Sequence, residues 1–337
     1  MVGREIIIEV ENVTPLFMRG VDQSRAEVRT SSIKGLMRWW FRALAGNYFG
    51  NNITGLKKAE GRIFGSTNHK AMFSLEIYCN EKPISIHKGK LLAPEIYNLG
   101  YLWFSIKMQA NKKQLCTYYP RGTKFDIVLK GGDEQVLDVA LISLWALVVL
   151  GSVGFRSRRG AGSLKFSRDT NDFKKIGLRT LFGSKDELAE SIENAISTIG
   201  EIIGKEPIKI DSYPNYPILS PNSSYVGLYK KGENPIDLLK TFQWEYSNFR
   251  KSLRGRDKLK RLIFGAPIIS FKVKDRRSSP MIIGVLPFDG QYSVKIVKFY
   301  TNQFSHNTFL DKHADWSILR LFNQHLDEIR VWGGPSG

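Results

Sequence analysis

The sequence is poor in the residues that most often carry metal or redox chemistry. Its 337 residues include only two cysteines, Cys79 and Cys116, and these lack the Cys-x-x-Cys spacing of metal and redox sites. A chain that needs no disulfide is typical of a reducing compartment. We therefore expect a cytoplasmic protein with no metal and no other cofactor.

Long apolar runs are missing as well. The most apolar stretch, Val139 to Leu150, would span about 18 Å as a helix, whereas the core of a bilayer is about 30 Å thick. The first residues show no basic-then-apolar leader, and the chain carries no acylation motif. These observations predict a buried helix and argue against a membrane partner.

The common catalytic motifs are also lacking. The sequence contains no His-Glu-x-x-His and no Gly-x-Ser-x-Gly segment. Its five histidines, His69, His87, His306, His313 and His325, are scattered. His306 and His313 are close in sequence, but the residues between them do not follow a helical pattern, so we do not expect an acid/base pair there.

Acidic residues are outnumbered by basic ones. The 50 Lys and Arg residues against 32 Asp and Glu give a formal net charge of +18. Such a surface attracts polyanions, which makes nucleic acid the expected partner. A basic membrane-surface protein would have the same sign of charge, but neither end of the chain carries a basic amphipathic segment.

The length predicts two domains, and the pattern of apolar residues predicts an α+β fold. β-rich or alternating segments indicate strands, and apolar residues at helical spacing indicate helices. The predicted strands are 5–10, 72–78, 102–108 and 124–129, and the predicted helices are 33–45 and 134–150. This order fits a ferredoxin-like plan.

The second half looks like a looser repeat of the first. Arg62-Ile63-Phe64-Gly65-Ser66 is echoed by the segment from Arg261 to Ala266, and a further helix is predicted over Lys185 to Ile203. A linker is expected near Ser167 to Lys175. We therefore expect two tandem ferredoxin-like domains, 1–168 and 169–337.

The helix predicted over Ile33 to Ala45 should have one cationic face. Ser31-Ser32 offers a helix N-cap and Gly46 is expected to end the helix. Lys34, Arg38 and Arg42 share the side opposite the apolar stripe. The helix N-terminus and Ser32 could hold a phosphate, with Gly35 allowing close approach. The alternative is an ordinary solvated basic face.

Aromatic residues in the same helix divide between two roles. Trp39 lies beside Gly35, where an exposed indole would offer a stacking surface for a base. Trp40 and Phe41 are expected in the core.

The segment from Gly151 to Ser163 combines four glycines with three arginines. Glycine permits positive φ, so successive N–H groups can turn toward one anion, and arginine adds bidentate charge. The segment lacks the P-loop ending and the Gly-x-Gly-x-x-Gly spacing, which excludes ATP and NAD as expected ligands. It is predicted to hold a nucleic-acid backbone, the alternative being a flexible surface turn. Its candidate residues are Gly154, Arg156, Arg158, Arg159, Gly160, Gly162 and Ser163.

A second cationic ridge is predicted in the other half, where basic residues again recur at helical spacing. They are Arg250, Arg254, Lys258 and Arg261. An ordinary solvent face is the alternative, because Gly255 can break the helix. Arg276 and Arg277, followed by Ser-Ser-Pro, are further candidate phosphate contacts or part of an ordinary loop.

These segments resemble the RAMP proteins of CRISPR systems, in particular the family of first-numbered RAMP subunits of type III-B Cmr effector complexes. The likeness rests on Thr14-Pro15-Leu16-Phe17, on the segment Ser32 to Arg42, and on Arg158 to Ser163. Phe64-Gly65 and the segment Arg276 to Pro280 are also similar to family features. Where many relatives have a glycine pair, this sequence has Met18-Arg19-Gly20.

The resemblance implies two RRM-like domains and a non-catalytic, RNA-binding subunit. It further implies contact with the 3′ portion of a CRISPR guide RNA, with a single-stranded target RNA and with other RAMP subunits of a Cmr complex. A metal-independent RAMP endoribonuclease that processes guide RNA through a histidine is the main alternative. A general RNA-binding or ribosome-assembly protein is a third.

Overall fold

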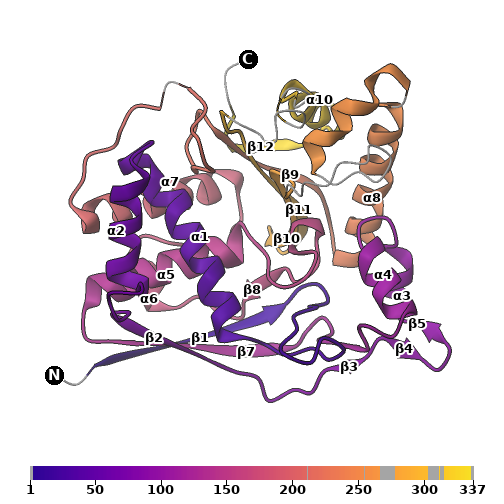
Figure 1. Ribbon diagram of the computed structural model, residues 1–337, viewed down its shortest axis with the longest axis horizontal. Helices are drawn as coiled ribbons and strands as arrows, with labels where there is room; N and C mark the ends of the chain where they lie inside the picture. The colour runs from indigo at the N-terminus through magenta and orange to yellow at the C-terminus, as the bar shows by residue number, and fades with distance from the viewer. Residues whose placement is uncertain are drawn as a thin grey trace.

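Two four-stranded antiparallel sheets organise the chain (Figure 1). A computed structural model describes residues 3–210, 212–253, 255–265, 278–302, 311 and 315–334. For residues 255–258 it describes the backbone only. Each sheet carries helices on at least one face, as expected for an α+β protein.

The first sheet has the strand order β2-β7-β1-β8. Its elements in chain order are β1 (Arg4–Asn12), α1 (Thr30–Phe49), α2 (Ile53–Phe64), β2 (Phe73–Tyr78), β7 (Lys124–Gly131), α5 (Glu134–Val149) and β8 (Leu164–Phe166). In β1, Ile6 and Ile8 are buried while Ile7 is exposed. One face of this sheet therefore packs on the core and the other faces solvent.

The second sheet has the order β10-β11-β9-β12. Its elements are β9 (Ser224–Gly232), α8 (Pro235–Ser252), the 3₁₀ segment η2 (Gly255–Phe264), β10 (Met281–Phe288), β11 (Gln291–Phe299), α10 (Ser317–Leu326) and β12 (Ile329–Gly333). The sequence of strands and helices, and the order of strands, both repeat those of the first sheet.

The predicted internal echo falls at matching places in this repeat. Phe64 ends α2 and Phe264 ends η2, and each is followed by a glycine in a left-handed conformation. Gly65 has φ 89° and Gly265 has φ 115°, which a residue with a Cβ adopts only with strain.

An insertion between β2 and β7 contains short elements. They are β3 (Ile84–Ser85), β4 (His87–Lys88), β5 (Leu91–Leu92), α3 (Pro94–Asn98), α4 (Phe104–Asn111) and β6 (Thr117–Tyr118). The strand predicted over 102–108 is wrong, because this stretch enters α4. Ile106 and Ala110 are buried four residues apart while Phe104 and Met108 are exposed, a helical face that the alternation in sequence concealed.

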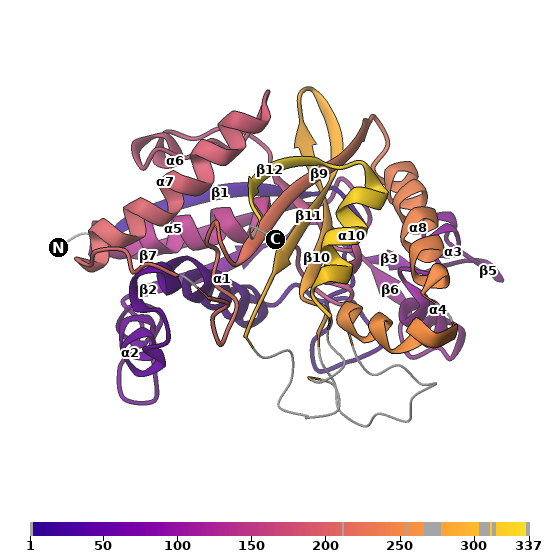
Figure 2. The ribbon, with the colours of Figure 1, turned by 90° about the horizontal axis from the view of Figure 1, so that it is seen from above.

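The two sheets and their helices are stacked. Ile8 of β1, Leu44 of α1, Trp145 of α5 and Val226 of β9 belong to one core, so α1 and α5 lie between the sheets. Helices α8 and α10 cover the opposite face of the second sheet through a separate core. Figure 2 shows β9, β10 and β11 between α1 and α5 on one side and α8 and α10 on the other.

Two further helices follow the first sheet. The predicted linker contains α6 (Asn171–Lys175), and α7 (Lys185–Ile203) has the bounds that the sequence predicted. Ser184 caps α7 by accepting a hydrogen bond from the N–H of Glu187. Helix α7 packs against α1 and α5.

Helix α1 is longer than the sequence predicted. Arg29 occupies the N-cap position in place of Ser31 or Ser32, and the helix continues past Gly46 to Phe49. Gly46 does not end the helix because it serves packing. A Cβ at this position would lie 2.8 Å from Cγ1 of Ile218, so only glycine allows that close approach.

Candidate nucleic-acid interface

The N-terminal part of α1 and the glycine-rich loop lie side by side. A cavity of about 480 Å³ is lined by Ser32 and Gly35 of α1 and by Gly154 and Phe155 of the loop. Apart from its two neighbours in sequence and the backbone of the helix itself, nothing in the described part of the chain comes within 4 Å of the Cβ position of Gly35. Two segments that the sequence proposed separately thus form one surface.

Arg19 is a further lining residue that sequence reasoning missed. Its guanidinium lies 5.1 Å from the ring centroid of Phe155, and its Nη1 donates to the carbonyl oxygen of Gln23 at 3.3 Å. Burial lowers the pKa of Arg19 from its usual value. The only signal in the sequence was the unusual Met18-Arg19-Gly20 segment.

The N-terminus of α1 is open to an anion. Among the described residues no side chain caps it, and its first turn holds no acidic residue. The Nζ of Lys34 lies 4.9 Å from the ring centroid of Phe73. Burial, and then the nearby charge of Arg38, lower the pKa of Lys34. A partly desolvated ammonium beside an uncapped helix N-terminus favours a negative partner.

Arg38 and Arg42 are anchored in place by Glu60 of α2, which is only 4% exposed. Glu60 Oε1 lies 2.5 Å from Arg38 Nε and 2.8 Å from Arg42 Nη1. One carboxylate between two guanidinium groups leaves a net positive charge and fixes both side chains. The predicted cationic face is therefore partly neutralised at these two arginines, by a partner that the sequence alone did not reveal.

Trp39 is half-buried, so the prediction of an exposed indole is wrong. It packs edge-on against Trp40 at 4.9 Å and against Phe299 of β11 at 5.3 Å between ring centroids. The guanidinium of Arg158 lies 5.4 Å from its ring centroid. The helix faces the second sheet here, which the sequence did not indicate. Trp40, at 2%, and Phe41, at 0% exposure, confirm their predicted core positions.

The end of the glycine-rich loop is committed to internal hydrogen bonds. The N–H groups of Gly160 and Gly162 donate to the carbonyl oxygens of Ile283 and Pro15, each at 2.9 Å. The N–H of Ser163 donates to Thr14 Oγ1 at 2.9 Å. The predicted anion cradle is therefore wrong at Gly160, Gly162 and Ser163, because β10 and the segment Thr14-Pro15 accept these three amides.

The backbone conformation of the loop agrees with the prediction of positive φ. Gly154, Gly160 and Gly162 have φ of 81°, 83° and 63°. A Cβ on Gly162 would lie 2.0 Å from the carbonyl oxygen of Val153. The glycines thus allow the loop to fold tightly between the two sheets, which excludes the alternative of a flexible surface turn.

The loop arginines bind carbonyl groups and aromatic rings. Arg158 Nη1 donates to the Ser279 oxygen at 2.6 Å, and Arg159 Nη2 donates to the Phe264 oxygen at 2.7 Å. Arg156 is half-buried in a left-handed conformation, with φ 66°. Burial, and then the charge of Arg159, lower the pKa of Arg156 to about 10.

The predicted second ridge is not one helix. Helix α8 ends at Ser252 and η2 begins at Gly255, so the helical spacing does not continue. Arg250 lies among the rings of Tyr246, Phe264 and Tyr101, at 5.4, 5.7 and 5.9 Å from their centroids. The other predicted contacts, Arg254, Arg276 and Arg277, lie outside the described residues, as does the side chain of Lys258.

The hydrogen bonds and ion pairs of His69, His87 and His325 do not involve the glycine-rich loop. His69 pairs with Ser66, His87 with the Ala110 oxygen and His325 with Glu245. His306 and His313 fall outside the described residues. Within the described ranges, no group of three His, Cys, Asp or Glu side chains could hold a metal ion. Cys79 and Cys116 are free thiols.

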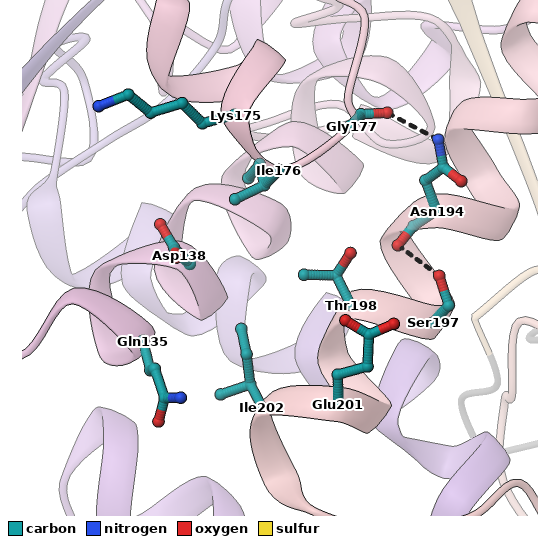
Figure 3. Close-up of a pocket in the computed structure, with 10 residues that line it drawn as sticks. All are labelled: Gln135, Asp138, Lys175, Ile176, Gly177, Asn194, Ser197, Thr198, Glu201 and Ile202. Carbon is teal, nitrogen blue, oxygen red and sulfur yellow. Dashed lines mark hydrogen bonds between the residues drawn. The ribbon is translucent and has the colours of Figure 1, made fainter.

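A second cavity, of about 550 Å³, lies between α5, α6 and α7 (Figure 3). Asp138, Lys175 and Glu201 line it. Burial, and then Glu134, raise the pKa of Asp138. A lining with two carboxylates does not favour a polyanion. This cavity shares no lining residue with the cavity between α1 and the glycine-rich loop.

No helix in the described part of the chain has the length and apolar character that crossing a bilayer requires.

Comparison with known proteins identifies the class of the chain. A family profile described as the RAMP superfamily matches residues 9–165, and one described as Cmr1-like, C-terminal, matches residues 223–333. The first range covers most of the first sheet, helix α1 and the glycine-rich loop. The second range covers the second sheet.

A relative that matches over nearly the full length of the chain gives the family. The sequence is 38% identical to the CRISPR system Cmr subunit Cmr1-1 of Pyrococcus furiosus over 98% of both chains. It is 41% identical to Cmr1-2 of the same organism over 48% of this chain and 94% of that one. The crystal structure of Cmr1 from Pyrococcus furiosus superposes with a TM-score of 0.77 at 34% identity, covering 98% of each chain. The chain belongs to the Cmr1 family of the RAMP superfamily.

A more distant structure shares the fold. The cryo-EM structure of a type III-B Cmr-beta complex bound to cognate target RNA contains a chain with a TM-score of 0.58 at 16% identity. The match covers 97% of this chain and 99% of that chain.

Proposed function

We propose that this protein is an RNA-binding subunit of a type III-B CRISPR effector complex of the Cmr type. It holds the 3′ portion of the guide RNA and the paired target RNA, beside other RAMP subunits, and does not cut either strand. The observation that carries this proposal is the single basic surface formed by the uncapped N-terminus of α1, Arg19 and the glycine-rich loop.

The fold supports the proposal through its repeat. Both halves have the order β-α-β-β-α-β, and numbering the four strands along each half gives the sheet order 2-3-1-4. This is the ferredoxin-like arrangement, which RRM modules share. We propose two tandem ferredoxin-like domains, 1–168 and 169–337, with α6 and α7 packing back on the first.

The proposed contacts divide between phosphates and bases. The first turn of α1, with Ser32 and Lys34, holds one phosphate, and Gly35 leaves room for the strand to approach. Arg38 and Arg42, oriented by Glu60, and Arg158 attract the neighbouring backbone. Such contacts fix the position of RNA and carry little sequence information. The sequence is read by base pairing between guide and target.

Similar proteins support the proposed place of this protein in an RNA-binding Cmr complex. The relative matched over its full length is a Cmr subunit, and a structure of the same fold comes from a complex bound to target RNA. We extend both properties to this chain as part of the proposal.

Binding of single-stranded RNA at several salt concentrations tests this proposal. The variant combines Arg19→Gln with Lys34→Gln, and the matched control combines Lys57→Gln with Lys185→Gln, which are exposed on α2 and α7. We expect the first pair to weaken binding about tenfold for every sequence and to lower the salt slope by about 1.4, because each phosphate contact to a single strand contributes about 0.7. The control pair, with the same loss of charge, should have a smaller effect.

Two outcomes would contradict the proposal. Equal affinities and salt slopes for the two double variants would remove the surface from RNA binding. Cleavage of CRISPR repeat RNA by the purified protein in chelator, abolished by substituting one histidine, would favour the endoribonuclease alternative.

A further inference from the structure

Three arginines gather around one buried tyrosine at the junction of the glycine-rich loop, α4 and α8. The guanidinium groups of Arg159 and Arg250 each lie 5.4 Å from the ring centroid of Tyr246. Arg250 also lies 5.9 Å from the ring of Tyr101. Arg156 is close enough to Arg159, Arg250 and Tyr246 for all three to influence its ionisation. We call these five residues the Tyr246 cluster.

The Tyr246 cluster is held rigidly. Trp103 Nε1 donates to the carbonyl oxygen of Arg159 at 2.9 Å, and Arg159 Nη2 donates to that of Phe264 at 2.7 Å. The side-chain oxygen of Gln243 accepts from the N–H of Tyr101 at 3.0 Å. Three segments distant in sequence are thereby fixed to one another, so the guanidinium groups are in place before any ligand arrives.

The positive charge of the cluster has no counter-charge in the described chain. Among the residues that the structure describes, no carboxylate forms an ion pair with Arg156, Arg159 or Arg250. In contrast, Glu60 balances Arg38 and Arg42 of α1. Clustering three like charges in a partly buried place is unfavourable unless an anion joins them.

Polar atoms of the cluster also lack hydrogen-bond partners. The Nε atoms of Arg156 and Arg250 are buried and form no hydrogen bond within the described residues. Burial opposes the charge of Arg250, but its contacts with the hydroxyl groups of Tyr246 and Tyr101 outweigh burial and raise its pKa. Buried donors are normally satisfied, and those that are not point to an unseen partner. Arg156 moreover holds a positive φ of 66°, a strain that is common where function fixes a side chain.

The number and arrangement of these donors favour one class of ligand. Guanidinium groups bind carboxylate and phosphate in bidentate fashion. A carboxylate has two oxygens, whereas three guanidinium groups gathered about one tyrosine suit the larger oxygen set of a phosphate. Tyr101 is 41% exposed and offers a ring beside the site on which a base can stack.

We propose that the Tyr246 cluster binds a phosphate group of an RNA strand, at a site separate from the N-terminus of α1. This inference rests on the proposed function for the source of the phosphate, whereas the anion site itself does not depend on it. The site would hold the strand where it leaves the α1 surface and passes toward α8.

Thermal unfolding with inorganic phosphate as the probe tests the anion site. Compared with chloride at equal ionic strength, phosphate should raise the Tm of the full chain by a few degrees. Arg156→Gly removes one guanidinium and also relieves the positive φ, so this variant should fold and lose most of the shift. Arg250→Gln should lose it as well. Arg121→Gln, at an exposed arginine, should keep the full shift.

The outcomes separate the two parts of the inference. Equal Tm values in phosphate and chloride for the unmodified chain, or a full phosphate shift in both cluster variants, would overturn the site. If phosphate no longer raises the Tm once single-stranded RNA is bound, RNA occupies the cluster, which supports an RNA strand as the source of the bound phosphate group. If RNA binds the α1 surface but leaves the phosphate shift of the cluster unchanged, the RNA source is overturned while the proposed function stands.

Discussion

The guanidinium of Arg158 lies over the indole of Trp39, 5.4 Å from its ring centroid, while its Nη1 donates to the carbonyl oxygen of Ser279 at 2.6 Å. Trp39 belongs to α1, and Ser279 lies two residues before β10 in the second half of the chain. One side chain thus connects the basic loop to both halves. The RNA-binding surface that we propose depends on how the two halves are docked.

Replacing Arg158 therefore affects both binding and docking. We expect Arg158→Ala to weaken RNA binding about tenfold, equally for all sequences. Arg158→Lys keeps the charge but loses the planar group that stacks on Trp39, so it should recover only part of the affinity. Fluorescence anisotropy with two unrelated RNA sequences measures this. Full recovery by lysine would show that charge alone matters.

Replacing Glu60 should affect the stability of the protein and its RNA binding in different ways. Glu60→Gln leaves Arg38 and Arg42 without their shared carboxylate, and we expect a loss of about 1–3 kcal/mol in the free energy of unfolding, because both arginines are partly exposed. RNA affinity at low salt should stay equal or rise, since two positive charges are released. Urea denaturation and RNA titration measure the two effects. A parallel loss of both would contradict this role.

Lys295 joins the second sheet to the first half of the chain. Its Nζ is buried and donates to the carbonyl oxygens of Val148 and Val149 at 2.9 and 2.8 Å, at the C-terminal end of α5. Burial lowers the pKa of Lys295 to about 7. The unfolded chain, with a lysine pKa of about 10.4, binds more protons than the folded chain between these values.

The sign of the pH effect follows from that difference. Stability should rise as pH increases above about 7, by up to about 1.4 kcal/mol per pH unit from this group alone. Lys295→Met removes the titrating group, so its unfolding free energy should rise less steeply between pH 7 and pH 10. Urea denaturation across this range compares the two proteins. Parallel pH profiles would mean that Lys295 stays protonated in the folded state.

The second sheet contains a buried ion pair. Lys298 and Glu328 are 0% and 1% exposed, with 3.0 Å between Nζ and Oε1. Glu328→Gln leaves the ammonium uncompensated, and we expect a loss of about 3–5 kcal/mol in the free energy of unfolding. Glu190→Gln on the exposed face of α7 is the matched control and should change stability by less than about 1 kcal/mol. Similar losses in the two variants would contradict the assignment.

Much of the fold could be predicted from the sequence because its strands and helices have strong local patterns. The strand at 5–10, the helix at 134–150 and the helix at 185–203 all occur close to their predicted bounds. The prediction of a strand over 102–108 was wrong, because the burial of Ile106 and Ala110, four residues apart, depends on contacts with the second core. The prediction that Gly46 ends the helix was wrong for a similar reason, since its close contact with Ile218 cannot be read from neighbouring residues.

The site was predicted in composition but not in arrangement. The sequence indicated which arginines and glycines are special. It did not indicate that Ile283 of β10 and Pro15 would accept hydrogen bonds from the amides of Gly160 and Gly162. Glu60 and Arg19 were missed because their partners are distant in sequence. Lys295 and Lys298 were missed because a buried lysine in a strand looks like any surface lysine until its neighbours are known.

Photocrosslinking of RNA to this protein within its complex in cells tests the central claim most directly, with mass spectrometry of the peptides and sequencing of the RNA. We expect crosslinked peptides from Arg19 to Arg42 and from Gly151 to Ser163, joined to RNA enriched in CRISPR spacers. Crosslinks confined to the solvent face of the first sheet, or RNA without spacer enrichment, would contradict the proposed function.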